Sequence, residues 1–86
     1  MLIEFFGREC PHCLAIAPLV KKLEDSGIRI KRYEVWHDAE NADLMEKYDR
    51  GGEFCGGVPL FVNEETGKRI CGEASYEEIL RLAEGR

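Results

Sequence analysis

Short apolar runs and helical spacings alternate along the first part of the chain. Leu2–Phe6 is an apolar and aromatic run that only Glu4 interrupts, which is typical of a central strand buried on both faces. Residues Pro11–Asp25 carry apolar side chains at helical spacing, with a proline in the first turn and a glycine shortly after the end. Ile28–Val35 mixes β-branched and aromatic residues with basic ones, which favours an edge strand.

The next part of the chain predicts a helix, a loop and a hairpin. Asp38 is a suitable cap for a helix that runs through Tyr48. Val58–Val62 reads as a strand with its proline near the start, where a missing N–H is tolerated, and Lys68–Cys71 is its predicted hairpin partner. Glycines mark the loop before this hairpin: Gly51, Gly52, Gly56 and Gly57.

The last helix has a clear start signal. Ser75 and Glu78 form a capping box, and an apolar side follows it, made of Tyr76, Ile79, Leu80 and Ala83. The resulting order is βαβαββα. We therefore expect one α/β domain over residues 1–86, with a four-stranded mixed sheet and helices on both faces.

Charge and hydropathy narrow the classes of partner. The net charge of −5 gives no electrostatic footprint for nucleic acid or an anionic membrane. No apolar run approaches the length of about 18 residues that spans a bilayer, and Leu2–Phe6 is too short for the apolar region of a signal peptide. We expect a cytoplasmic monomer that binds neither nucleic acid nor membrane.

Two of the four cysteines carry the candidate chemistry. Cys10 and Cys13 form a CxxC that follows a strand and opens a helix, where free N–H groups and the helix dipole favour a thiolate on Cys10. The thiolate is the attacking species in disulfide exchange, and Cys13, one turn away, can resolve the mixed disulfide. Pro11 and His12 between them bring no acid, and a protonated His12 would favour the thiolate further.

A zinc site is the alternative for the same motif. CxxC is common in zinc ribbons, and His12, Cys55 and Cys71 are further ligand types in the chain. Zinc ribbons show two paired knuckles, whereas Cys55 and Cys71 are 16 residues apart. A CxxC beside a βαβ pattern favours redox chemistry, so we assign no metal ligand.

The segment Leu2–Cys13 resembles the active-site strand and helix of thioredoxins, glutaredoxins and protein disulfide isomerases. Glu4, six residues before the first cysteine, matches the buried carboxylate of thioredoxin and isomerase domains. Pro18 matches their helix-kinking proline, and Val58-Pro59 resembles their cis-proline segment. The resemblance covers nearly the whole chain and implies a minimal thioredoxin fold of glutaredoxin size.

The resemblance also implies roles for single residues. Glu4, desolvated in an apolar strand, would take the proton from Cys13 during resolution, whereas an edge glutamate in water is the alternative. A cis-Pro59 would leave the backbone at Val58 free to pair with an extended substrate, whereas an ordinary trans proline in a turn would not. Pro11, His12, Val58 and Pro59 are thus the expected substrate-binding residues.

Two features depart from the family pattern. Glu9 stands where thioredoxins carry a tryptophan before the first cysteine, which alters the apolar platform for substrates. The glycine-rich turn of a glutathione pocket is replaced by Gly72-Glu73-Ala74-Ser75, so glutathione use is unsupported.

Cys55 and Cys71 form a second candidate pair. An antiparallel hairpin beside the first strand puts both at the sheet end that carries Cys10. They are expected to form a second disulfide, to relay electrons to the main pair or to complete a metal site, or else to be small buried hydrophobes.

The sequence therefore predicts a thiol-disulfide oxidoreductase that exchanges electrons with protein disulfides through Cys10 and Cys13. It needs no organic cofactor beyond this redox-active disulfide, and a reductase or another dithiol must recycle the pair. The alternatives are a metal-binding protein that uses Cys10, Cys13 and Cys55 or Cys71, and a redox-responsive binding module without turnover.

Overall fold

Each predicted element forms in the order that the sequence pattern gives. The computed structural model describes residues 1–49 and 55–86. Its elements are β1 (Leu2–Phe6), α1 (Pro11–Asp25), β2 (Ile30–Glu34), α2 (Ala39–Asp49), β3 (Leu60–Asn63), β4 (Arg69–Cys71) and α3 (Tyr76–Ala83). The capping box at Ser75 and Glu78 is present, with both reciprocal hydrogen bonds made at 3.2 Å between donor and acceptor atoms.

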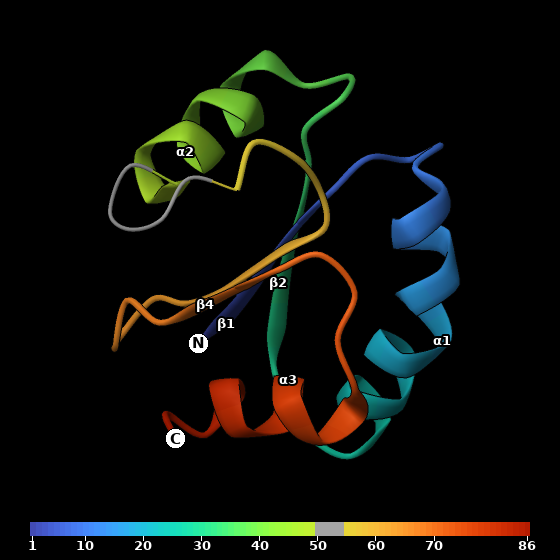
Figure 1. The fold of residues 1–86 in the computed structure, drawn as a ribbon, viewed down its shortest axis with the longest axis vertical. Coiled ribbons are helices and arrows are strands. Elements are labelled where there is room, and N and C mark those ends of the chain that lie inside the picture. Colours follow the sequence, from blue (N-terminus) through green and yellow to red (C-terminus); the bar gives the residue numbers. More distant parts are fainter. Residues whose placement is uncertain (50–54) are drawn as a thin grey trace.

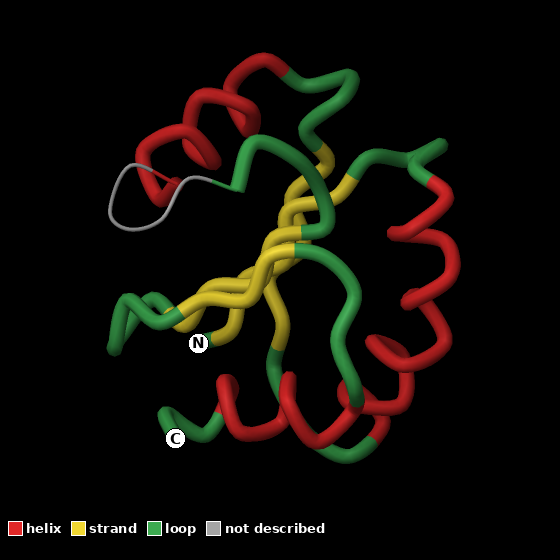
Figure 2. The backbone as a smooth tube through the Cα atoms, viewed as in Figure 1, coloured by secondary structure: helices red, strands yellow, loops and turns green. Residues whose placement is uncertain are grey.

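The four strands form one mixed sheet in the order β2-β1-β3-β4. Strand β1 runs parallel to β2 and antiparallel to β3, and β3 runs antiparallel to β4. As predicted, β2 is an edge strand and β1 is central, with four of its five residues buried. The loops that follow β1 and β4 and the loop that precedes β3 leave the sheet at one end, away from the N-terminus (Figure 2).

Helices cover both faces of the sheet, because the strand residues alternate between two apolar clusters. Helices α1 and α3 pack on one face and α2 on the other (Figure 1). The first cluster contains Leu2, Ile16, Val20, Leu23, Phe61, Ile79 and Leu82. The second contains Ile3, Phe5, Leu60 and Val62, with Leu44, Met45 and Tyr48 of α2 against it.

Three strands begin later than predicted. Strand β3 begins at Leu60 and not at Val58, because the Val58-Pro59 bond is cis and a proline has no N–H for the ladder. Strand β2 begins at Ile30 because the Ile28 amide still donates to Leu23 at the end of α1.

At the other end of the hairpin, Lys68 belongs to the turn, where its amide donates to Thr66, so β4 begins at Arg69. Of the predicted glycine loop, Gly51 and Gly52 lie outside the described residues.

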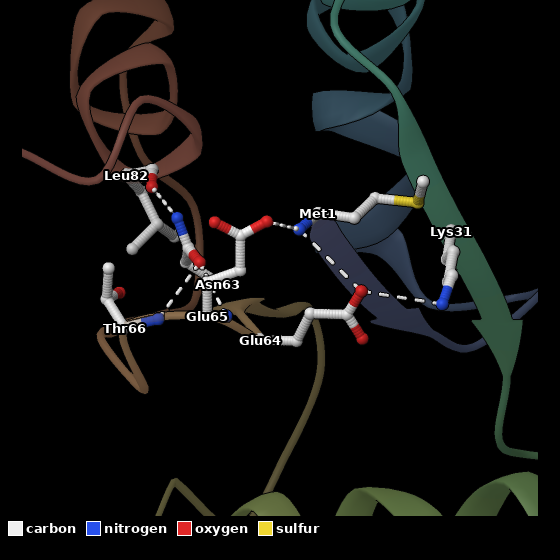
Figure 3. Close-up of polar contacts among 7 residues, drawn as sticks. All are labelled: Met1, Lys31, Asn63, Glu64, Glu65, Thr66 and Leu82. Atoms are coloured by element: carbon white, nitrogen blue, oxygen red, sulfur yellow. Dashed lines mark hydrogen bonds and ion pairs between the residues drawn. The ribbon is translucent and has the colours of Figure 1, made fainter.

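The sheet end remote from Cys10 is closed by a buried amide. The Asn63 side chain donates to the Leu82 carbonyl at 2.8 Å and accepts from the amides of Glu65 and Thr66 (Figure 3). This side chain joins the β3–β4 turn to α3. None of the helices in the described ranges is long and apolar enough to cross a membrane.

A buried ion pair ties the end of α2 and the loop before β3 to strand β4. Asp49, the last residue of α2, accepts hydrogen bonds from the Cys55 amide at 2.8 Å and the Gly56 amide at 3.1 Å. The Arg69 guanidinium of β4 donates to the same carboxylate at 3.0 Å and to the Tyr48 carbonyl at 2.9 Å. Desolvation raises the pKa of Asp49, but the two amides and Arg69 outweigh it and lower the pKa below its usual value.

The variant Asp49→Asn tests this anchor. It leaves the Arg69 charge buried without its partner, so the unfolding free energy at pH 7 is expected to fall by about 3 kcal/mol. Urea denaturation at equilibrium measures it. Because the pKa of Asp49 is lowered on folding, the carboxylate stabilises the fold above pH 3.8, and its advantage over Asn disappears as the pH falls below that value.

Asp43→Asn is the matched control, since Asp43 is exposed on the same helix. Its effect should stay within about 0.5 kcal/mol. Equal losses in the two variants would contradict the anchoring role of Asp49.

Candidate functional site

The strand register brings three loops together. Phe5, near the end of β1, pairs with Leu60, and Leu60 pairs in turn with Cys71 at the end of β4. The segment that leads from β1 to Cys10 therefore adjoins the start of β3, which adjoins the end of β4. This end of the sheet holds the predicted chemistry.

Cys10 caps the N-terminus of α1. Its backbone is extended, with φ −68° and ψ 119°, and Pro11 occupies the first helical turn, where its missing N–H costs nothing. The Cys10 amide donates to the Gly7 carbonyl at 3.0 Å. The Cys13 amide donates to the Cys10 sulfur, with 3.4 Å between N and Sγ. A backbone donor at a helix N-terminus is the interaction that stabilises a thiolate.

Cys10 and Cys13 are both free thiols, and each is only 3% exposed. The Cys10 thiol donates to the Val58 carbonyl, with 3.7 Å between Sγ and O. The structure thus brings the CxxC pair against the segment that contains Pro59, as predicted.

The Cys13 thiol holds its proton tightly. Burial raises the pKa of Cys13 to about 12, and the hydrogen bond with Cys10 and the charges of Cys10 and Glu4 add to this, against a backbone hydrogen bond with Gly7. A thiol with this pKa is almost wholly protonated at neutral pH. An attack by Cys13 therefore needs a proton acceptor close by.

Glu4 is the carboxyl group whose charge contributes to the raised pKa of Cys13. It is completely buried on the sheet face that α1 and α3 cover, on the same side as Leu2, so the alternative of an edge glutamate in water is wrong. Its Oε1 accepts from the Arg32 Nε at 2.6 Å, whereas its Oε2 has no hydrogen-bond partner among the described residues. Desolvation raises the pKa of Glu4, and Arg32 opposes that rise only in part.

The Val58-Pro59 peptide bond is cis, so the alternative of an ordinary trans proline is wrong. Pro59 is buried, and its carbonyl accepts from the Gly72 amide at 2.8 Å. Val58 is half-buried, and within residues 1–49 and 55–86 nothing accepts a hydrogen bond from its amide.

His12 turns away from the thiol. It is 69% exposed, and its Nδ1 lies 2.7 Å from the Glu73 carboxylate. On the other side of the CxxC motif, Glu9 pairs with His37, with 2.6 Å between Oε1 and Nε2, and this hydrogen bond lowers the pKa of Glu9. Two imidazole–carboxylate pairs thus flank the cysteines, so the surface around them is polar.

One cluster of potential metal ligands occurs within the described ranges. The ligand atoms of Glu9, Glu34 and His37 lie within 4.8 Å of one another. The Glu34 carboxylate already accepts the amides of Arg8 at 2.8 Å and His37 at 2.7 Å. Desolvation raises the pKa of Glu34, but these amides outweigh it and lower the pKa. This cluster is a polar junction between two loops, and it includes no cysteine.

Cys55 and Cys71 are joined in a disulfide, with 5.6 Å between their Cα atoms. The prediction of a second disulfide at this end of the sheet is confirmed, and the alternative of two unlinked hydrophobes is wrong. In this state neither sulfur is a thiolate, so the pair offers no ligand to complete a zinc site with Cys10 and Cys13. The bond ties the loop before Pro59 to the end of β4.

An exposed aromatic ring borders the site. Trp36 is 51% exposed, and its indole lies directly over Gly7, where an added Cβ would come within 2.3 Å of it. Gly7 is therefore required by this close approach, and it fixes the ring beside the loop that leads to Cys10. A shallow pocket lies elsewhere, at the opposite end of the sheet, lined by Met1, Leu2, Gly27, Ile28, Arg29, Glu65 and Ala83.

Sequence reasoning missed three partners. Arg32 pairs with Glu4 only because the parallel register sets them opposite each other, and the register was not assigned. Asp49 is an acidic residue at a helix end, which is typical of an exposed position, and nothing in the sequence spacing indicates that it is buried. His37 pairs with Glu9, 28 residues away, and no local sequence signal joins the two residues.

Comparison with protein-family models, with curated proteins and with solved structures finds no match for this chain. The fold and the geometry of the site carry the functional assignment.

The pH dependence of stability in Glu4→Gln tests the state of the buried carboxyl. Because folding raises the pKa of Glu4, its protonated form stabilises the fold below pH 4.5, and this contribution is lost as the pH rises through the folded-state pKa. Gln does not titrate. The stability of Glu4→Gln relative to the wild type should therefore increase between pH 4.5 and pH 8, on the order of 1 kcal/mol.

Urea denaturation at a series of pH values measures the difference. Glu77→Gln, an exposed change on α3, is the control and should show a nearly flat difference. A stability advantage of Glu4→Gln that shrinks with rising pH would mean that the carboxyl is better stabilised as an anion.

Proposed function

We propose that the protein is a thiol-disulfide oxidoreductase with a minimal thioredoxin-like fold, acting through Cys10 and Cys13. The observation that carries the proposal is the placement of the Cys10 thiol at the start of α1 and against the cis Val58-Pro59 segment. The motif resemblance, the βαβαββα order and the strand order β2-β1-β3-β4 support it.

In the first step, the Cys10 thiolate attacks one sulfur of a substrate disulfide. A bond forms between Cys10 and that sulfur, the substrate disulfide breaks, and the second substrate sulfur leaves as a thiolate. The Cys13 amide, which donates to the Cys10 sulfur, favours the attacking thiolate.

In the second step, Cys13 resolves the mixed disulfide. Glu4 accepts the Cys13 proton on Oε2, the Cys13 sulfur attacks Cys10, and the substrate sulfur bound to Cys10 leaves as a second thiolate. One substrate thiolate takes up the proton that Glu4 held, and the other takes a proton from water. The products are a Cys10–Cys13 disulfide and a reduced substrate. A reductase or another dithiol recycles the pair, and the same steps run in reverse if the protein oxidises its partner.

The substrate class follows from the groups around Cys10. An extended peptide can accept a hydrogen bond from the Val58 amide and pack on the Trp36 indole, which supplies an aromatic surface although Glu9 stands before the cysteine. The geometry thus supports protein disulfides as substrates.

Matched serine variants test the proposal. The wild type should catalyse the reduction of insulin by dithiothreitol, and Cys10→Ser should fall to the rate of dithiothreitol alone because no attacking thiolate remains. Cys13→Ser should instead accumulate a covalent mixed disulfide with the substrate, because attack proceeds and resolution does not. Turbidity and non-reducing mass spectrometry measure the two outcomes.

The two variants carry the same chemical change three residues apart, so a general loss of folding would affect both. A wild type that never exceeds the dithiothreitol rate would contradict the proposal. Stoichiometric zinc that protects Cys10 and Cys13 from alkylation would favour the metal-binding alternative, and inactivity without zinc would favour the binding module.

A further inference from the structure

The two sulfur centres differ in exposure. Cys10 and Cys13 are buried, whereas Cys71 is exposed at the end of an edge strand and Cys55 is half-buried in the loop before Pro59. The disulfide between Cys55 and Cys71 is thus the centre that external thiols can reach more readily. In the structure this outer centre is oxidised and the inner centre is reduced.

Both centres adjoin the Val58-Pro59 dipeptide. The Cys10 thiol donates to the carbonyl of Val58, and the next carbonyl, that of Pro59, accepts from Gly72, the residue after Cys71. Cys55 lies three residues before Val58 on the same loop. The Val58-Pro59 segment therefore lies between the Cys10 thiol and the loop and strand end that carry the outer disulfide.

The outer cysteines are held together by more than their own bond. Asp49 accepts from the Cys55 amide, and the same carboxylate binds Arg69, two residues before Cys71 on β4. The β3–β4 ladder, which pairs Leu60 with Cys71, also fixes this strand. When the disulfide opens, these contacts keep the two thiols near each other, so closing it again costs little chain entropy. Such a pair is suited to reversible oxidation.

We infer that Cys55 and Cys71 are a second redox centre, which exchanges two electrons with the Cys10–Cys13 pair of the same chain. This inference rests on the proposed function, because it needs a Cys10 thiolate that attacks disulfides. It assigns to the second pair the role of an internal disulfide substrate at the surface, through which the buried dithiol exchanges electrons with external thiols.

The exchange balances within one chain. The Cys10 thiolate attacks Cys71, a Cys10–Cys71 bond forms, the Cys55–Cys71 bond breaks, and Cys55 leaves as a thiolate. Cys13 then gives up its proton and attacks Cys10, and Cys71 leaves as a second thiolate. The single proton released by Cys13 ends on one of the two departing sulfurs. Two electrons have moved from the inner pair to the outer pair without an external oxidant.

The variant Cys13→Ser traps the intermediate. It is prepared with the Cys55–Cys71 bond intact and Cys10 reduced and is incubated without any alkylating reagent. The remaining thiols are then labelled rapidly with N-ethylmaleimide. We expect a monomeric product with a Cys10–Cys71 link and a labelled Cys55, identified by peptide mass spectrometry without reduction. The link should form at a rate independent of protein concentration.

The double variant with Cys10→Ser and Cys13→Ser is the control and should keep its Cys55–Cys71 bond. An intact Cys55–Cys71 bond in Cys13→Ser after prolonged incubation would overturn the inference and leave the disulfide as a structural crosslink. Disulfide-linked dimers as the sole product would equally overturn exchange within one chain.

A measurement on the wild type needs no substitution. Fully reduced protein is oxidised with one equivalent of diamide, and the fractions of the two disulfides are followed by alkylation and mass spectrometry. Exchange predicts that the fractions drift to one fixed ratio, whichever pair is oxidised first. Fractions that stay at their initial values, in protein that still reduces insulin, would remove this inference alone. Protein that fails to reduce insulin would remove the proposed function as well.

Discussion

The position of β3 between β1 and β4 is the constraint on which the rest of the structure depends. Its antiparallel pairing with β1 sets Leu60 opposite Phe5, and its pairing with β4 sets Leu60 opposite Cys71. The Val58-Pro59 segment thereby lies between the N-terminus of α1 and the end of β4. A register shift of one residue would move every β3 side chain to the opposite face of the sheet and would separate these loops. All four sulfurs owe their common location to this strand.

Asp49 and Glu4 are buried carboxylates on opposite faces of the sheet, and the groups around each one determine whether its pKa is lowered or raised. Asp49 has three donors, two amides and Arg69, which together favour its charged form over the cost of burial. Among residues 1–49 and 55–86, Glu4 has one donor, Arg32, and its second oxygen has no partner, so burial prevails and its pKa rises. The satisfied carboxylate holds a loop in place, and the unsatisfied one is the proton acceptor that we propose for Cys13.

The sequence pattern predicted the elements, the edge and central strands and the cysteine cluster, because these follow from local signals. Leu2–Phe6 is apolar on both faces, Ser75 begins a capped helix, and the CxxC opens the first helix. The predicted start of β3 was wrong because Pro59, which lies within an apolar run, has no N–H for the ladder, so the strand begins at Leu60. The pairings that depend on register, such as Arg32 with Glu4, and on long-range packing, such as Asp49 with Arg69, left no trace in the spacing.

The most direct test of the account is a redox titration of Cys10 and Cys13. The protein is equilibrated in glutathione buffers of graded potential, thiols are alkylated in acid-quenched samples, and each cysteine peptide is quantified by mass spectrometry. The account predicts that Cys10 and Cys13 lose their thiols together, in one reversible two-electron transition that joins them in a disulfide. Oxidation of one cysteine without the other, or two thiols that stay free in the most oxidising buffer, would contradict it.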